Sequence, residues 1–430
     1  MNELALSSDA DARRALANAL TVSRMLEARP MLVDVARAED VVPGVTASTI
    51  LTSGAPLGWE SYQGGQRRSV LNAALFEGLA QDHEEADRLI LEGAITVGTT
   101  QAHGCIGSVA GIYTASMPVL VVEDATFGGR AYCNLYEGKS PMRLNYGAYG
   151  ETVIESLRWL ESVMGPVLAE VLRRTGPIDL KSIMARALRM GDELHSRNTA
   201  ATMLFDRTIR DVLTEMVFDG SMPQARHVIE FLEENDYTFL RMGMAAAKCT
   251  ADAAHGIERS SVVTGIVIDC LGLSIRVSGL GDQWFTGAHP TLEGRFFDGF
   301  GPDDAEWIGG ESCFTEVVGL GGFAQACAPT LQAYQGGDYA AMLRANEEMY
   351  RITVAEHDEF LLPPFSFRGS PVGIDVELVI REGLTPAIDG GLAGKTGGQI
   401  GAGVLRPHLD CFELARGAYV AAYDPQHGGQ

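Results

Sequence analysis

The sequence of 430 residues lacks features that mark several common protein classes. It has no apolar run near the ~20 residues that a membrane-spanning helix needs, and its start, MNELALSSDADARR, lacks the basic-then-apolar order of a signal peptide. Its seven cysteines include no C-x-x-C pair, which argues against a disulfide framework and a zinc knuckle. We therefore expect a cytoplasmic protein with reduced thiols and no bound metal.

Positive charge is also scarce. The chain has 33 Lys and Arg residues against 56 Asp and Glu residues, a formal net charge of −23. This charge repels nucleic-acid phosphates and anionic lipid, so roles on nucleic acid or on a membrane surface are disfavoured. An anionic ligand must therefore find a locally basic pocket.

Nucleotide-binding motifs are absent too. The run GKT (394–396) ends like a P-loop, but Asp389 stands where the first glycine is needed, and GGQIGAG does not follow the order G-x-G-x-x-G. Segment 390–407 still offers many backbone N–H groups for an anion, so Gln399 and Gly401 join the substrate-binding candidates. No cofactor is expected.

The order of helical and strand-like patterns predicts three parts. Short apolar runs alternate with helical patterns in the first third of the chain, and helical spacing then takes over until strand composition returns at 260–269. The predicted fold class is α/β, with two mixed α/β parts separated by an all-helical middle domain. The predicted domains are an N-terminal α/β domain (1–149), a helical domain (150–258) and a C-terminal α/β domain (259–430).

The first candidate site is a glycine-punctuated loop after a strand-like run. Arg276 supplies a permanent cation, and Gly279 and Gly281 let the backbone approach a ligand. Asp282 is a catalytic candidate, and Trp284 forms a wall that excludes water. A purely structural bridge between Arg276 and Asp282 is the alternative.

The second candidate site is GDELHSRNTAAT (191–202), which we predict to be helical. Asp192, His195 and Asn198 then share a face at spacing i, i+3 and i+6. Asp192 would orient His195 for acid–base catalysis, while Arg197 or Asn198 would hold a substrate carboxylate or carbonyl. A solvated helix face or a polar contact between helices is the alternative.

Four more residues complete the candidates. His103 lies in a glycine-rich loop after a strand and could donate to an oxyanion, or simply occupy a tight turn. His255 lies on a predicted helix and is a substrate-binding candidate, with a favourable helix C-terminus as the alternative. Arg130 and Arg143 suit a carboxylate or phosphate, unless they only form surface ion pairs.

Segments spread over nearly the whole chain carry a family resemblance. They include GLSIRVSGLGDQWFTG (272–287), VVPGVTASTIL (41–51), ALFEGLA (74–80), SMPVLVVED (116–124), GRAYCNL (129–135), GPIDLKSI (176–183), GDELHSRNTAAT (191–202), DAAHGI (252–257) and GQIGAGVLRP (398–407). With them the chain resembles the YlbE (AllG) type subunit of oxamate carbamoyltransferase.

The resemblance implies a reaction and partners. The implied reaction interconverts oxalurate plus phosphate with oxamate plus carbamoyl phosphate in purine (allantoin) breakdown, and the implied companions are an FdrA (AllF) type and a YlbF (AllH) type protein. The ordinary transcarbamoylase motifs are missing: no Ser-Thr-Arg-Thr run occurs, and HPTL (289–292) departs from His-Pro-x-Gln. Two alternatives stay open, a non-catalytic scaffold subunit of that complex and a carbamoyltransferase or amidohydrolase for another ureido acid. A homo-oligomer is also left open.

Overall fold

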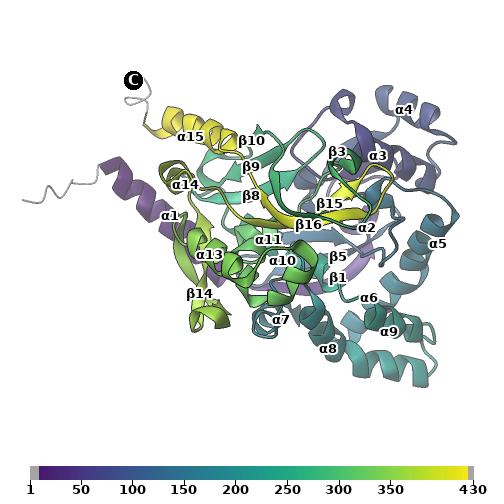
Figure 1. Cartoon of the computed structure of the whole chain (residues 1–430). Coiled ribbons are helices and arrows are strands. Elements are labelled where there is room, and N and C mark those ends of the chain that lie inside the picture. Colours follow the sequence, from purple (N-terminus) through teal and green to yellow (C-terminus); the bar gives the residue numbers. More distant parts are fainter. Residues whose placement is uncertain (1–8, 425–430) are drawn as a thin grey trace, which may run out of the picture.

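The computed structural model describes residues 9–424 as a mixed α/β fold (Figure 1). The expected fold class is confirmed, although most neighbouring strands run antiparallel and are divided among several small sheets. All seven cysteines are buried and none forms a disulfide. No helix within residues 9–424 is both long enough and apolar enough to cross a lipid bilayer.

The helices cover the sheets from several sides. They are α1 (Asp9–Glu27), α2 (Ala38–Val41), α3 (Gly64–Glu77), α4 (His83–Leu91), α5 (Glu151–Trp159), α6 (Gly165–Thr175), α7 (Leu180–Leu188), α8 (Thr199–Phe218), α9 (Ala225–Glu234), α10 (Phe239–Ala253), α11 (Phe314–Val317), α12 (Gln332–Gln335), α13 (Tyr339–Met349), α14 (Val376–Glu382) and α15 (Asp410–Tyr423).

The strands are short in most cases. They are β1 (Pro30–Arg37), β2 (Thr49–Thr52), β3 (Thr96–Thr99), β4 (Cys105–Ile106), β5 (Pro118–Asp124), β6 (Arg130–Asn134), β7 (Ile178–Asp179), β8 (Val263–Ile268), β9 (Leu273–Val277), β10 (Trp284–Gly287), β11 (Thr291–Phe296), β12 (Ala305–Glu306), β13 (Thr353–Leu362), β14 (Arg368–Ile374), β15 (Ile388–Gly394) and β16 (Gln399–Arg406).

The N-terminal sheet has the strand order β4-β6-β5-β1-β7. Strands β1 and β5 pair antiparallel, with Leu32 opposite Val122, whereas β4 and β6 are parallel neighbours. Residues 118–122 of β5 are all buried. A strand that is covered on both faces has no polar side, which explains its unbroken apolar run.

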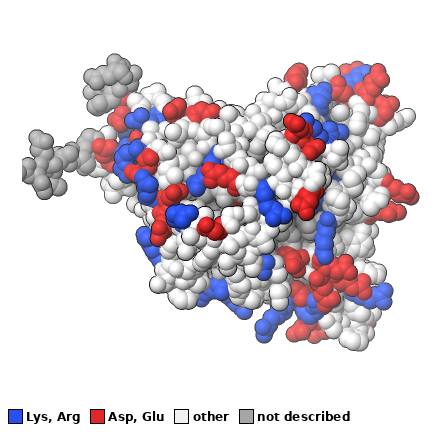
Figure 2. Space-filling model, in the orientation of Figure 1, with Lys and Arg blue, Asp and Glu red and all other residues white. Residues whose placement is uncertain are grey.

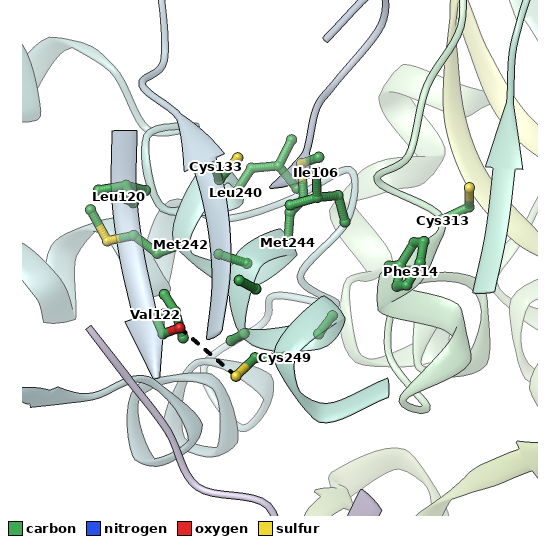
Figure 3. Close-up of a cluster of buried hydrophobic side chains, with 14 of the residues drawn as sticks. Ile106, Leu120, Val122, Cys133, Leu240, Met242, Met244, Cys249, Cys313 and Phe314 are labelled. Carbon is green, nitrogen blue, oxygen red and sulfur yellow. Dashed lines mark hydrogen bonds between the residues drawn. The ribbon is translucent and has the colours of Figure 1, made fainter. Parts of the chain in front are cut away.

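Residues 239–251 of helix α10 are all buried, and Figure 3 shows part of the hydrophobic cluster around them. On one side Met242 and Met244 pack with β5 and β6, and the Cys249 Sγ lies 3.9 Å from the carbonyl oxygen of Val122. On the other side α10 contacts α11, which begins at Phe314. This one helix therefore connects the N-terminal sheet with a segment about 190 residues further along the chain.

The C-terminal part contains a four-stranded sheet of order β11-β16-β15-β12 and a three-stranded sheet of order β10-β9-β8. In the first, Gly294 lies opposite Gly403. A Cβ on Gly403 would come within 2.5 Å of the Glu293 carbonyl oxygen, so the close approach of β11 and β16 requires glycine there.

The segment between α7 and α8 differs from the prediction. The prediction of a helix over 191–202 is wrong, because residues 189–198 form an irregular turn with positive φ at Gly191 (104°) and Leu194 (73°). The Glu193 carboxylate accepts hydrogen bonds from the backbone N–H groups of His195 and Arg197. A side chain that captures backbone donors in this way competes with the helical pattern.

The three predicted domains share contacts. One hydrophobic cluster contains Val22, Phe205 and Phe412, one residue from each part. The Asn18 amide of α1 donates to Ser261 Oγ at 3.1 Å, which ties the N-terminal helix to the C-terminal part. In Figure 1, α1 and α15 accordingly lie at the same end of the molecule. The division at 149 and 258 stays a prediction.

Candidate functional site

Two adjoining chambers form a cleft where the segments after β4 and β6 meet β15 and β16. The inner chamber has a cavity volume of about 80 Å³ and the outer chamber about 510 Å³. The outer volume is within the range of small-molecule ligand sites, and the inner chamber adds room for a small group beside it. Residues that line both chambers are Ser108, Tyr146, Ser196, Tyr237, Leu240, Tyr334 and Gln399.

Two residues at the inner chamber have left-handed backbone. Val109, which lines it, has φ 56°, and Leu194, next to His195, has φ 73°. Left-handed backbone at such residues costs of order 1–3 kcal/mol and clusters at functional sites. Ile112 N donates to the Asn145 side chain at 2.8 Å, and Ala110 N donates to its carbonyl oxygen, which holds the Val109 turn in place.

Ser312, His195 and Glu316 form a hydrogen-bonded row at the inner chamber. The His195 Nδ1 lies 2.8 Å from Glu316 Oε1, and its Nε2 lies 2.7 Å from Ser312 Oγ. Glu316 is fully buried, whereas Ser312 is only half-buried and lines the chamber. A hydroxyl, an imidazole and a carboxylate in this order form a nucleophile with its general base and the group that orients the base.

The electrostatics of the row favour a basic imidazole. Backbone N–H groups of Gly322 and Asp389 donate to Glu316 Oε1 at 2.9 and 3.0 Å, so they fix this carboxylate beside His195. Burial by itself would lower the pKa of His195, but the adjacent Glu316 charge raises it above its usual value. A raised pKa makes the imidazole a stronger general base.

Two further carboxyl groups lie beside the row. Burial, with the nearby Glu316 charge, raises the pKa of Asp389, and burial together with Asp389 raises that of Glu193. Asp389 lines the inner chamber, and its Oδ1 accepts a hydrogen bond from Gln325 at 2.5 Å. A buried carboxyl that keeps its proton can donate a hydrogen bond to a ligand carbonyl.

Two guanidinium groups lie in the wall of the outer chamber. Arg241 on α10 is buried and donates to Asn134 Oδ1 at 3.3 Å. Arg143 donates to the carbonyl oxygen of Gly138 at 3.3 Å and lies 4.5 Å above the Tyr146 ring. Both hydrogen bonds are to neutral groups, and the carboxylate in this wall is the buried Glu137, whose charge helps to raise the pKa of Arg143.

Four buried polar atoms at this cleft have no hydrogen-bond partner among residues 9–424. They are the Nε atoms of Arg143 and Arg241, the Oδ1 of Asn198 and the Oδ2 of Asp389. Buried polar atoms in folded proteins are nearly always paired, so unpaired atoms gathered at one cleft indicate a polar ligand. Their types fit an anion that also carries amide or carbonyl groups.

The surface charge gives no sign of an extended anion-binding surface. On the face drawn in Figure 2, acidic side chains lie beside basic ones rather than leaving an extended field of positive charge. With a net charge of −23, the chain attracts no anion over long range. Recognition of an anion therefore depends on the few cations inside the cleft.

The structure brings several predicted site residues into this cleft. They are His195, Asn198, Arg197, Arg143 and Gln399. Asp192 does not orient His195 as expected, because its Oδ2 accepts from the Ala201 N–H at 2.8 Å in the first turn of α8. Burial raises the pKa of Asp192 to about 6. The carboxylate that orients His195 is Glu316, which comes from a distant part of the sequence.

The Arg276 loop has a different environment. The Arg276 Nη2 lies 2.6 Å from Asp252 Oδ1, and Lys248 Nζ lies 2.8 Å from the other Asp252 oxygen. The alternative reading, a bridge between Arg276 and Asp282, does not form, because the Asp282 side chain is fully exposed and lies 3.7 Å from His255 Nε2. The buried guanidinium thus has an anionic partner within the protein.

The remaining predicted residues also lie outside the lining of both chambers. His103 Nδ1 is 2.7 Å from the Pro43 carbonyl oxygen, and Arg130 forms an exposed ion pair with Glu123 at 2.8 Å. Their roles stay predictions. Predicted residues outside the lining are Asp192, His103, Arg130, His255, Arg276, Gly279, Gly281, Asp282, Trp284 and Gly401.

Ser312, Glu316 and Arg241 were not predicted from the sequence. His195 and Ser312 are 117 residues apart in the chain, so no local spacing connects them. The run ESCFTE (311–316) places Ser312 and Glu316 four residues apart, one helical turn, but that spacing is common on ordinary helices. Only the strained turn at 189–198 brings the imidazole between them.

Comparison with known proteins places the chain among named relatives. The profile of the family "Oxamate carbamoyltransferase subunit AllG" matches residues 95–312. The chain is 37% identical over 406 residues to the oxamate carbamoyltransferase subunit AllG of Escherichia coli, covering 93% of this chain and 96% of that protein. It is 39% identical over 403 residues to the uncharacterized protein YahG of Escherichia coli, covering 93% and 85%.

A solved structure shares the fold. It is the crystal structure of a conserved protein of unknown function from Enterococcus faecalis, with a TM-score of 0.92 and 36% identity. The match covers 96% of this chain and 99% of that one. The whole arrangement of sheets described above is therefore similar to that of a protein with known coordinates.

Proposed function

This chain belongs to the family of oxamate carbamoyltransferase subunits named AllG, and from that membership we propose that it supplies a carbamoyl-transfer site to such an enzyme. The proposed reaction interconverts oxalurate plus phosphate with oxamate plus carbamoyl phosphate. The observation that carries the proposal is the cleft in which the Ser312–His195–Glu316 row adjoins two guanidinium groups that lack an anionic contact.

The outer chamber supplies the cations that this reaction needs. Each of its substrates and products is an anion, and guanidinium groups bind carboxylates and phosphates in a two-pronged geometry. We assign the oxamate carboxylate and the phosphate group to Arg143 and Arg241, with Arg197 and Lys139 at the same wall. Asn198, whose Oδ1 is unpaired, is placed to accept a hydrogen bond from a substrate amide.

The inner chamber supplies acid–base chemistry. The amide nitrogen of oxamate is a poor nucleophile and must lose a proton as its new bond to carbon forms. His195 Nε2 is the base that can take a proton at this wall, while Glu316 stabilises the resulting imidazolium. A protonated Asp389 can stabilise negative charge on the carbonyl oxygen.

We also propose the setting of this reaction. The relative's name calls that protein a subunit, which supports a role within an assembly. The proposed companions are the FdrA-type and YlbF-type proteins, and the proposed pathway is purine (allantoin) breakdown. In this assembly the companions cover the mouth of the cleft and exclude water that would hydrolyse a carbamoyl group.

The test measures carbamoyl phosphate release from oxalurate and phosphate by the full three-protein complex and by this chain alone. His195→Gln should lower kcat by about 10³-fold, because general base catalysis contributes up to about 10⁴-fold. Arg241→Ala should raise KM through loss of a charge-assisted contact. The matched control is Arg173→Ala, since Arg173 is 70% exposed and contacts only Glu170 on the same helix.

The outcomes separate catalysis from scaffolding. Low activity of the His195 and Arg241 variants in complexes that still assemble, with wild-type activity of Arg173→Ala, supports the cleft as the reaction site. Wild-type activity in all three variants would overturn the proposal and assign the chain a scaffold role. Size-exclusion chromatography of each complex confirms that assembly is intact.

A further inference from the structure

We infer that Ser312 is a covalent nucleophile that carries the carbamoyl group between phosphate and the acceptor nitrogen. The inference deepens the proposed function and rests on it for the identity of the group transferred. It predicts two half-reactions with an O-carbamoyl serine between them, rather than direct transfer from one substrate to the other.

The hydrogen-bond geometry distinguishes Ser312 from other hydroxyls at the cleft. Its Oγ is 2.7 Å from an imidazole nitrogen whose other nitrogen is held by a buried carboxylate. Ser196 also lines the inner chamber, but its Oγ only accepts a weak bond from Gln335 Nε2 at 3.4 Å. A serine becomes nucleophilic when a base can take its proton as the bond forms, and Ser312 has that base.

The backbone around Ser312 is rigid, which keeps the hydroxyl in position. Glu311 precedes it, and the Glu311 carboxylate accepts from Gly54 N at 3.0 Å, Gly107 N at 2.6 Å and Thr100 Oγ1 at 2.6 Å. Cys313 follows it, and the Cys313 Sγ lies 2.9 Å from the Ile266 carbonyl oxygen. A reacting group held by fixed neighbours on both sides loses little freedom when the substrate binds.

Two backbone N–H groups at Ser312 are candidates to donate hydrogen bonds to the developing negative charge. The backbone N–H groups of Ser312 and Cys313 form no hydrogen bond with any other group of residues 9–424, whereas those of Glu311 and Phe314 do. Asp389 lines the same chamber with an unpaired Oδ2. Such donors can stabilise the oxyanion that forms when a carbonyl carbon is attacked.

The first half-reaction starts from carbamoyl phosphate. The Ser312 Oγ forms a bond to the carbamoyl carbon, and its proton moves to His195 Nε2. The bond between that carbon and the phosphate oxygen breaks, and inorganic phosphate leaves with the proton from His195. The product is Ser312 O-carbamate, and no oxidant or reductant takes part.

The second half-reaction uses oxamate as acceptor. The amide nitrogen of oxamate bonds to the carbamoyl carbon and gives one proton to His195 Nε2. The bond between that carbon and Ser312 Oγ breaks, and His195 returns the proton to Oγ. Oxalurate leaves and the free serine is restored, so the same imidazole acts as base and then as acid in each half.

The experiment traps the intermediate in the full complex. Carbon-labelled carbamoyl phosphate is added without oxamate, the reaction is stopped with acid, and peptides are examined by mass spectrometry. We expect one carbamoyl group on the peptide that contains Ser312, released when oxamate is added before the acid. Cyanate from carbamoyl phosphate also labels lysines, so the position of the label, not its amount, is decisive.

Three variants make the result specific. Ser312→Ala should lose the label and lower kcat by about 10³-fold or more, as expected when a nucleophile is removed. Ser312→Cys should keep a label, now on sulfur, and show the same thermal unfolding as the wild type. Ser162→Ala is the matched control, because Ser162 is an exposed helical serine that donates only to Arg158 O.

The outcomes distinguish this inference from the proposed function. An unlabelled wild-type complex, together with a folded Ser312→Ala variant that turns over oxalurate normally, would overturn the covalent route but leave carbamoyl transfer intact. If the wild-type complex does not turn over oxalurate, a fluorophosphonate probe is applied. Labelling of Ser312 in the wild type and not in His195→Gln would then support the nucleophile while refuting the proposed substrate.

Discussion

Two clusters of the described residues, one at His195 and one at His255, each place a histidine beside acidic groups, but only the first lines the cleft. In the cleft, His195 lies between Ser312 and Glu316, whose charge raises its pKa. Under the Arg276 loop, His255 Nδ1 lies 2.8 Å from Thr264 Oγ1, and burial together with the Arg276 charge lowers its pKa to about 4. The first imidazole is therefore a stronger base than usual, and the second is a weaker one.

The pairing of charges explains this difference. Burial would raise the pKa of Asp252, but Lys248 and Arg276 lower it to about 2, so this carboxylate stays charged between two cations. That cluster satisfies its charges internally. In the cleft, the hydrogen bonds of Arg143 and Arg241 go to neutral groups. Unpaired Nε atoms occur in both clusters, at Arg276 as well as at Arg143 and Arg241. The difference is that Arg276 forms an ion pair with Asp252, whereas Arg143 and Arg241 line a chamber without such a contact.

The strongest test of this comparison removes the charge beside His195. Glu316→Gln keeps the shape and can leave its oxygen on the three donors, with the amide nitrogen toward Thr315 Oγ1. We expect kcat to fall by about 10³-fold, about 4 kcal/mol, because the imidazolium loses its counter-charge. Steady-state kinetics of the complex measures the fall in kcat. Since Glu316 raises the pKa of His195, its loss should also move the acid limb of the pH profile to lower pH.

A control and a contrary result accompany this test. Glu170→Gln changes a carboxylate that contacts only Arg173 and Arg174 on its own surface helix, and should leave kcat unchanged. Undiminished activity of a folded Glu316→Gln variant would mean that the row is structural.

The matching change in the other cluster should affect stability instead. Asp252→Asn leaves Lys248 and Arg276 buried without their anion, and we expect a loss of about 3 kcal/mol in the free energy of unfolding. The kcat of the folded variant should be unchanged. Denaturant titration measures the loss, and Asp219→Asn, an exposed partner of Arg174, should leave the free energy of unfolding nearly unchanged. Lost activity at full stability would instead support the anion site that the sequence suggests at Arg276.

At the outer chamber we expect a smaller effect, on KM rather than on stability. Arg143→Lys keeps the positive charge but loses the planar fork, and we expect KM for oxalurate to rise by about 10-fold with thermal stability unchanged. Arg143→Ala should raise KM further, by about 30-fold, about 2 kcal/mol. Arg368→Lys is the control, because Arg368 is 47% exposed and pairs with Glu356 at the surface. Equal KM values for Arg143→Lys and wild type would indicate that Arg143 binds no planar anion.

The parts of the fold that repeat a simple pattern could be predicted from sequence. The apolar run at 118–124 is strand β5, and helix α4 begins after Asp82, whose side chain accepts from Glu85 N at 2.8 Å. Such elements follow from local periodicity and capping. The helix expected at 191–202 fails because Glu193 captures backbone donors, which a periodic pattern does not show.

The candidate site could be predicted only in part. His195 and Arg143 were identified by residue type, because imidazole and guanidinium are the usual groups for acid–base chemistry and anions. Their partners were not, since Ser312 and Glu316 meet His195 across more than a hundred residues of sequence. Arg276 shows the reverse case, because a half-buried aspartate on α10 neutralises the cation that the sequence places before the glycine-rich loop.

The last expected effect is the pH dependence of stability at His255, in the second cluster. Its folded-state pKa of about 4 lies below the unfolded value near 6.5, so the folded state resists a proton that the unfolded state accepts. Stability from this group is therefore present above about pH 6.5 and is lost as pH falls toward 4, at up to about 1.4 kcal/mol per pH unit. Lys248 and Arg276 oppose protonation, while Asp252 and Asp282 favour it. Denaturant titrations of wild type and His255→Gln between pH 7 and 4.5 isolate this contribution, because acidic groups common to both chains cancel in the difference. The variant should lose stability less steeply than the wild type over this range, and parallel pH profiles would show that His255 is protonated as easily in the folded chain as in the unfolded one.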